Sequence, residues 1–255
     1  MRLASICCLL FICCSGLFAQ TAPLVSKVYT WDGSPSGSKK IGTIKEIFNG
    51  SGAVLASHEM RGVSLKKGKS KTYKANKTES FFIVKNGPVK VTLNNRESIL
   101  DRGSVVFVLP GDKVLIESNG DKDAAYYLMT YQSIQPADAE RGKKAGPSFV
   151  INWNDMVAKP TDKGSTRQLF DRQTTMLNRF DIHVTQLNQG FNSHPPHTHQ
   201  NEEIILMLGG NAEMQIGTEK QKANDGDVVL LNSMVLHNLT NIGTTPCLYF
   251  AIQWN

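Results

Sequence analysis

The second half of this chain repeats the pattern of the first half at a constant offset of 123 residues. With that shift, Gly103 falls on Gly226, and the paired valines that follow each glycine coincide. Tyr126 falls on Tyr249, and the register holds without a gap over residues 74–132. Agreement of glycines and apolar runs over such a length is typical of a tandem repeat. The sequence therefore predicts two copies of one folding unit.

Each copy consists of short apolar runs separated by turn-forming residues. The first copy contains SFFIVKNG, GSVVFVLPGD and AAYYLMTYQ, and the second contains EIILMLGG, GDVVLLNSM and CLYFAIQW. Short runs that are rich in β-branched and aromatic residues, and that are bounded by turn formers, are typical of β-strands. No long helical periodicity interrupts them. The sequence therefore predicts an all-β protein.

A polar segment separates the two copies. Residues 135–149 (QPADAERGKKAGPSF) are rich in glycine, proline and charge, and residues 151–160 (INWNDMVAKP) allow one short helix. We therefore predict an N-terminal domain over residues 20–140 and a C-terminal domain over residues 141–255. Residues 20–60 hold further strand-like segments, which we expect to pack on the partner domain or to exchange into it.

The first 19 residues have the layout of a secretory signal peptide. Arg2 precedes an apolar run at residues 6–12, small residues follow, and we expect cleavage after Ala19. The apolar run is too short to cross a bilayer comfortably, so no membrane span is expected. We therefore expect an exported bacterial protein, periplasmic or extracellular. A lipoprotein anchor is the competing interpretation, but Ile12 stands where a small residue usually precedes the modified cysteine.

Removal of this segment would leave one cysteine in the chain. The four cysteines inside it are Cys7, Cys8, Cys13 and Cys14. Cys247 remains, so the mature chain cannot form an internal disulfide, and its stability must come from the hydrophobic core. Because Cys247 lies in an apolar, strand-like run, we expect a buried side chain and not a nucleophile.

The chain carries a net charge of +6, and much of the excess lies in SLKKGKSKTYKANK, residues 64–77. We interpret this segment as a solvated edge strand or loop, where lysines prevent pairing with other chains. An anionic partner, such as an acidic glycan or lipid headgroups, is the functional alternative. The basic run has few aromatic residues and the chain is expected to be exported, so no nucleic-acid partner is predicted.

Histidines and carboxylates are concentrated in the second copy, in HPPHTHQNEE, residues 194–203. If HTH is extended, the side chains of His197 and His199 project from the same face. Glu203 follows four residues later, and the run GDVVLLNSMVLHNLTN supplies His237. Imidazole suits zinc, copper, iron and nickel, and a carboxylate adds neutralising charge. These four residues are therefore predicted to bind one divalent transition metal.

The spacing of these residues resembles the two sequence motifs of the cupin family. Residues 190–210 read G-x6-H-x-H-x3-E-x6-G, which is similar to the first motif with one additional residue near its start. Residues 226–241 read G-x5-N-x-M-x2-H-x3-N, which is similar to the second motif. Asn232 and Met234 stand where the family usually has proline and glycine, so the turn differs while the ligand spacing is kept.

This resemblance implies two tandem double-stranded β-helix (jelly-roll) barrels, with a metal inside the mouth of the C-terminal barrel. It implies that the ligands are His197, His199, Glu203 and His237. The metal would be manganese, iron, nickel, copper or zinc, with one or two coordination positions open for water or substrate.

The first copy lacks all four ligand types. At the same offset, the corresponding residues are Lys74, Asn76, Ser80 and Val114. The glycines of the repeat persist although the ligands are absent. We therefore predict a bicupin with one metal per chain and a degenerate metal site in the N-terminal barrel.

A His3Glu metal with open positions can act as a Lewis acid, or can activate dioxygen if the metal is redox-active. We therefore predict a metal-dependent enzyme that acts on a small molecule by dioxygenase, isomerase or lyase chemistry. The alternative is a non-catalytic barrel that binds a sugar or another small ligand. The two-barrel plan and the segment FDIHVTQLNQG are also similar to ureidoglycine aminohydrolases, which is a further alternative.

The remaining polar residues of the second copy are assigned by strand position alone. Tyr249, Gln186 and Met207 are candidates for the pocket wall, and no catalytic acid or base is identified. His183 alternates with apolar neighbours, so we expect a structural or pocket-lining role for it. His194 is interpreted as a polar surface or rim group. Two fused barrels already resemble a dimer, so a monomer or a homodimer is expected.

Overall fold

The computed structural model describes residues 22–31, 35–36, 40–74 and 76–255. Strands dominate this part of the chain, whose helical elements are α1 (Ala139–Ala145) and the 3-10 helix η1 (Trp153–Asp155). The prediction of an all-β protein is therefore confirmed. The predicted signal peptide, residues 1–19, lies outside the described residues. Neither of the described helices is long and apolar enough to cross a membrane.

The first barrel combines a seven-stranded and a four-stranded sheet within the described residues. In spatial order, the larger sheet contains β12 (Phe149–Ile151), β9 (Val105–Val108), β6 (Glu79–Asn86), β11 (Ala124–Ser133), β4 (Leu55–Leu65), β3 (Gly42–Gly50) and β2 (Pro35–Ser36). The smaller sheet contains β5 (Ser70–Lys74), β10 (Lys113–Ser118), β7 (Val89–Leu93) and β8 (Arg96–Leu100).

The second barrel has the same plan, with a seven-stranded and a three-stranded sheet in the part of the chain that is described. Its larger sheet contains β1 (Lys27–Tyr29), β19 (Val228–Leu231), β16 (Glu202–Gly209), β21 (Cys247–Trp254), β15 (Phe180–Leu187), β14 (Gly164–Arg172) and β13 (Lys159–Thr161). Its smaller sheet contains β18 (Glu219–Asn224), β17 (Asn211–Ile216) and β20 (His237–Asn241). The strands β6 and β16 begin at equivalent positions of the predicted repeat, as do β9 and β19.

The two halves of the chain exchange their first strands. The strand β1 precedes the first barrel in sequence but pairs with β19 of the second barrel. The strand β12 follows the first barrel but pairs with β9 of that barrel. The expectation that residues 20–60 contribute strands to the partner domain is thus confirmed for β1. The domain limits at residues 20–140 and 141–255 remain predictions.

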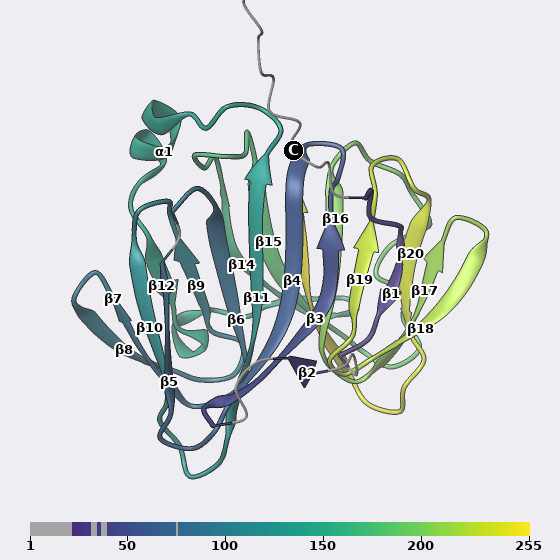
Figure 1. The fold of residues 1–255 in the computed structure, drawn as a ribbon. Coiled ribbons are helices and arrows are strands. Elements are labelled where there is room, and N and C mark those ends of the chain that lie inside the picture. The colour runs from purple at the N-terminus through teal and green to yellow at the C-terminus, as the bar shows by residue number, and fades with distance from the viewer. Residues whose placement is uncertain (1–21, 32–34, 37–39, 75) are drawn as a thin grey trace, which may run out of the picture.

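The largest hydrophobic core lies between the two seven-stranded sheets. These sheets meet in the middle of the molecule, while the hairpins β7-β8 and β17-β18 lie at its outer sides (Figure 1). Phe81 of the first barrel contacts Phe180 of the second, with ring centroids 5.7 Å apart. Phe107 contacts Phe180 at 6.0 Å. Each barrel also has its own smaller core, so burial of apolar surface both builds the barrels and joins them.

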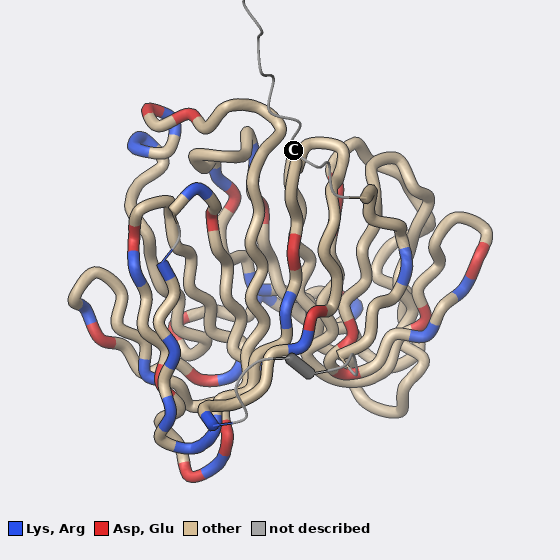
Figure 2. Tube along the Cα trace, viewed as in Figure 1, with Lys and Arg blue, Asp and Glu red and all other residues tan. Residues whose placement is uncertain are grey.

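Three local predictions from the sequence are confirmed. The expected short helix within residues 151–160 is η1, where the side chain of Asn152 caps the helix by accepting a hydrogen bond from Asn154 N at 3.0 Å. The side chain of Cys247 is buried. The lysine-rich segment includes β5, which lies at the edge of its sheet, and Figure 2 shows lysines along it. Lysines on an exposed edge oppose pairing with another chain.

The helix α1 lies in residues 135–149, for which the composition predicts only a polar linker. Asp138 caps the helix, because its carboxylate accepts a hydrogen bond from Arg141 N at 2.8 Å. The guanidinium of Arg141 donates to the carbonyl oxygens of Thr174 and Thr175 at 2.7 and 3.0 Å. A seven-residue helix is marginal by itself, so these tertiary contacts account for its presence.

A buried carboxylate of the first half binds a loop of the second half. Glu79, at the start of β6, is fully buried. Its carboxylate accepts hydrogen bonds from Thr174 Oγ1 at 2.7 Å, from Thr175 N at 2.8 Å and from Met176 N at 3.3 Å. Burial raises the pKa of Glu79, although these hydrogen bonds oppose the rise.

An equivalent glutamate of the second half binds a loop of the first half. Glu202, at the start of β16, is buried and occupies the position of Glu79 in the repeat. Its carboxylate accepts hydrogen bonds from Ala53 N at 3.0 Å and from Trp254 Nε1 at 3.2 Å. The interface is therefore pseudo-symmetric in its polar contacts as well as in its strand exchange.

Substitution of Glu79 tests the energetic weight of this contact. Glu79→Ala removes the acceptor for three buried donors, so we expect the free energy of unfolding to fall by about 3 kcal/mol. Glu97→Ala is the control, because the exposed side chain of Glu97 forms an ion pair with Lys90 at the surface, and little change in the free energy of unfolding is expected. Urea unfolding measures both values. Equal effects of the two substitutions would contradict the structural role of Glu79.

Candidate metal centre

The four predicted ligands come from three neighbouring segments of the second barrel. Glu203 lies in β16, His237 begins β20, and His197 and His199 lie in the loop before β16. The backbones of His197 and His237 form an isolated antiparallel bridge, with N–H to O distances of 3.2 and 3.0 Å in the two directions. Met234 N donates to the carbonyl oxygen of His199 at 2.8 Å. Backbone hydrogen bonds thus hold the loop against β20.

The side chains of these residues gather at one place. The Nε2 atoms of His237 and His199 lie 3.1 and 3.3 Å from Glu203 Oε2. The ring of His197 lies 4.6 Å from that of His237 and 5.3 Å from that of His199, centroid to centroid. The structure therefore brings together all four residues that the motifs single out. Metal binding by them remains a prediction.

Backbone contacts fix the orientation of two of the imidazoles. His199 Nδ1 lies 2.9 Å from the carbonyl oxygen of Asn201, and His237 Nδ1 lies 2.8 Å from that of Val235. A carbonyl oxygen only accepts, so each Nδ1 carries the proton and each Nε2 presents a lone pair. Both Nε2 atoms are buried and make no hydrogen bond of good geometry. Such a backbone contact at the second ring nitrogen is usual for histidines that bind metals.

The carboxylate of Glu203 is a buried negative charge. The side chain is 6% exposed, and Gln253 Nε2 donates to its Oε1 at 3.1 Å. Burial alone would raise the pKa of Glu203, but His199, His237 and Gln253 lower it to about 2. The negative charge of this buried carboxylate can be balanced by a proton on a neighbouring imidazole or by a bound cation. The donor set therefore fits a divalent transition metal.

The structure places His194 closer to this cluster than the sequence indicates. Its ring lies 4.0 Å from that of His197 and 6.0 Å from that of His237, and the side chain is partly buried. Two prolines, at positions 195 and 196, separate His194 from His197. Proline restricts both its own backbone and that of the preceding residue. The two prolines are therefore the sequence feature from which a rigid turn at His194 could have been predicted.

A pocket of about 430 Å³ adjoins the histidine cluster. Gln186 and Tyr249 line it, as expected from their strand positions, and so does His183. Met207, the third candidate for the wall, is fully buried in the barrel core. Lys163 also lines the pocket, with its ammonium group 2.8 Å from the carbonyl oxygen of Asn192. Burial raises the pKa of Tyr249, so its hydroxyl stays protonated and can donate a hydrogen bond.

Aromatic side chains fill the corresponding part of the first barrel. Val114, which replaces the histidine of the second motif, is fully buried. The hydroxyl groups of Tyr73 and Tyr126 lie 2.7 Å apart, and the ring of Phe82 lies 5.2 Å from that of Tyr73. Among the described residues, both groups of three or more side chains with converging metal-binding atoms lie in the second barrel. In the first barrel, apolar and aromatic side chains thus fill the space that corresponds to the histidine cluster of the second.

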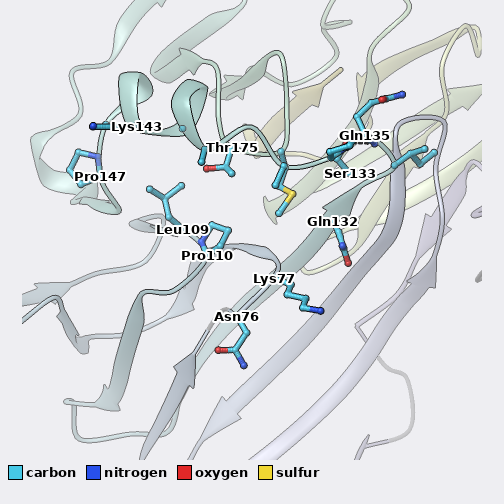
Figure 3. A pocket seen from close by; sticks show the side chains of 17 residues that line it. Asn76, Lys77, Leu109, Pro110, Gln132, Ser133, Gln135, Lys143, Pro147 and Thr175 are labelled. Carbon is cyan, nitrogen blue, oxygen red and sulfur yellow. Dashed lines mark hydrogen bonds between the residues drawn. The ribbon is translucent and has the colours of Figure 1, made fainter. Parts of the chain in front are cut away.

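A larger groove of about 960 Å³ lies away from the histidine cluster, between the end of β11, the helix α1 and Thr175 (Figure 3). Lys77 and Lys143 lie on opposite sides of it (Figure 3). Its lining residues include no histidine, cysteine, aspartate or glutamate. Its described lining thus offers two lysines and none of the usual metal-binding side chains.

Comparison with known proteins identifies a matching domain family and solved structures with a similar fold. Residues 183–253 match the cupin domain. AerE from Microcystis aeruginosa has a TM-score of 0.67 and 12% identity, covering 89% of this chain and 99% of its own. Protein Ylba from E. coli has a TM-score of 0.66 and 12% identity, covering 89% of each chain. Oxalate decarboxylase from Lactobacillus farciminis, solved as a formate complex, has a TM-score of 0.69 and 14% identity, covering 91% of this chain and 87% of its own.

A curated relative matches a smaller part of the chain. The uncharacterized HTH-type transcriptional regulator YdeC of Bacillus subtilis (strain 168) is 28% identical over 107 residues, which are 42% of this chain. The match covers 33% of that relative, so the chain spans about one third of the relative's length. The structural matches confirm the predicted fold of two tandem cupin-like barrels, and the family model matches the second of them over residues 183–253.

The acid stability of the metal-free protein tests the state of Glu203. Its pKa is lowered from 4.5 to about 2, so it contributes stability above pH 4.5 that is lost as the pH falls towards 2. We expect chelator-treated wild type to lose stability over this interval more steeply than Glu203→Gln, which has no carboxylate there. Denaturant unfolding between pH 5 and 2 measures this difference. Identical slopes in the two proteins would show that Glu203 is not the responsible group.

Proposed function

We propose that this chain is an exported, metal-dependent enzyme that acts on a small molecule in its C-terminal barrel. The proposed ligands of the metal are His197, His199, Glu203 and His237. The observation that carries this proposal is the convergence of unpartnered Nε2 atoms on a buried, ionised carboxylate at the edge of a pocket. Imidazole nitrogens together with a carboxylate oxygen are a donor set that suits a divalent transition metal.

A divalent metal at this place would supply Lewis acidity, or redox chemistry if it were iron, manganese, copper or nickel. Residues of the chain would orient the carboxylate ligand and contact the substrate. Gln253 holds one oxygen of Glu203, so the other oxygen faces the imidazoles. Tyr249 offers a protonated hydroxyl to a bound oxygen atom, and Lys163 offers a positive charge in the same pocket.

The pocket favours a small anionic substrate, such as a carboxylate or hydroxy acid. A volume of about 430 Å³ is at the lower end of the usual range for small-molecule sites. Lys163 and the metal would both attract a carboxylate group. One structural neighbour is named oxalate decarboxylase and was solved with formate, which supports a search among small carboxylates. We propose dioxygenase, isomerase or lyase chemistry on a molecule of this class.

Elemental analysis of the purified protein tests the metal site. We expect about one equivalent of a divalent transition metal per chain in the wild type, and none in the double variant His197→Ala, His237→Ala. Lys74→Ala is the matched control, because Lys74 is exposed and is the counterpart of His197 in the first barrel. It should keep the full equivalent.

The identity of the metal would direct the next experiment. A redox-active metal would lead to assays of dioxygen consumption with small carboxylates, whereas zinc would lead to isomerase and lyase substrates. Absence of metal from the wild type, even after reconstitution, would contradict the enzyme proposal. A non-catalytic barrel that binds a sugar or another small ligand would then be the better account.

Export is a separate proposal that depends on the first 19 residues. N-terminal sequencing of the protein recovered from fractionated bacterial cells should begin at Gln20, and the protein should be found in the periplasm or the medium. Replacement of two residues of the apolar run, Leu9→Arg and Leu10→Arg, should retain the uncleaved chain in the cell. Recovery of the intact N-terminus from wild-type cells would contradict this proposal.

A further inference from the structure

We infer that His194 is an additional ligand of the metal centre, so that this chain offers four imidazoles and one carboxylate to the ion. The inference rests on the proposed metal-binding function of the same site. The first cupin-like motif does not specify His194, which falls among the six unspecified residues between Gly190 and His197.

The positions of the donor atoms support this inference. The ligand atoms of His194, His197 and His237 all lie within 4.8 Å of one another. Those of His199, Glu203 and His237 also lie within 4.8 Å of one another. The two triads share His237 and are therefore adjacent. His197 belongs to the triad of His194, so His194 lies with a residue that the motif itself assigns to the metal.

The hydrogen bonding of His194 matches that of two of the assigned ligands, His199 and His237. Its Nδ1 lies 3.0 Å from the carbonyl oxygen of Pro195. Because that oxygen can only accept, Nδ1 carries the proton and Nε2 presents a lone pair. His199 and His237 have the same arrangement, each with Nδ1 bound to a nearby carbonyl oxygen. The tautomer of His194 is thus the one that a metal ligand requires.

The loop that carries His194 is fixed to the strand that carries His237. Isolated bridges join Asn192 to Thr240 and His197 to His237, and His194 lies between them. Ser193 N donates to the carbonyl oxygen of Leu239 at 2.8 Å. The imidazole of His194 therefore projects from a segment that is anchored on both sides. Ligands held on anchored backbone lose little conformational freedom when they bind a metal.

An additional imidazole changes what the centre can bind. Four nitrogen donors favour copper, nickel, zinc and iron over manganese, which prefers oxygen donors. His194 would also occupy a coordination position that the His3Glu set leaves open. A substrate would then bind either beside His194 or in its place.

Metal binding by His194 variants tests the inference. Chelator-treated wild type, His194→Ala and His194→Asn would be titrated with Co²⁺ by calorimetry and loaded with Cu²⁺ for electron paramagnetic resonance. We expect the Co²⁺ affinity of both variants to fall by about tenfold or more. The Cu²⁺ spectrum should show one nitrogen fewer than in the wild type. Phe191→Ala is the matched control, because Phe191 lies in the same loop with an exposed side chain outside the pocket.

Each outcome of this experiment supports or overturns the inference. Wild-type affinity and nitrogen count in the His194 variants would overturn it, and the proposed function would stand because the ion still binds. No Co²⁺ binding by the wild type would instead remove the proposed function itself. The variant His194→Asn guards against a folding defect, because its amide can still donate to the carbonyl oxygen of Pro195. Circular dichroism of the metal-free proteins would verify that the variants fold.

Discussion

Glu79 and Glu202 are buried glutamates at the interface of the two seven-stranded sheets, and the other half of the chain supplies hydrogen-bond donors to each. A buried carboxylate without such donors is strongly destabilising, so the halves must dock in the register that satisfies both. Successive residues of a strand point to opposite faces. Because Glu202 faces the interface, Glu203 is directed into the second barrel. The contact that joins the halves thus also positions the carboxylate of the candidate metal centre.

Comparison of the two copies distinguishes the residues of the shared interface from those of the candidate metal site. Both keep the interface glutamate, but the residue after it is Ser80 in the first copy and Glu203 in the second. The first barrel fills its interior with Tyr73 and Tyr126, whose hydroxyl groups meet, whereas the second keeps a polar pocket beside its histidines. Packing of aromatic side chains stabilises the interior of the first barrel. The two barrels therefore differ in their interiors and agree at their interface.

Much of this organisation follows from the sequence, because it depends on local patterns. The 123-residue offset predicts the paired barrels, and the spacing of His197, His199, Glu203 and His237 predicts their convergence. What the sequence does not reveal depends on contacts between distant segments. The helix α1 exists because Arg141 binds carbonyl oxygens of the second half. The approach of His194 depends on a turn through two prolines and on pairing with β20, and its own residue type gives no sign of either.

The exchanged strands have a consequence for how such a chain can evolve. If the repeat arose by duplication, the first copy was free to lose its ligands, but it could not be deleted. Without it, β19 would lose its partner β1 and expose an unpaired edge. The second barrel would also expose the apolar face that now packs on Phe81 and Phe107. Under that history, the first copy would persist as an internal scaffold for the second barrel, whatever became of its own site.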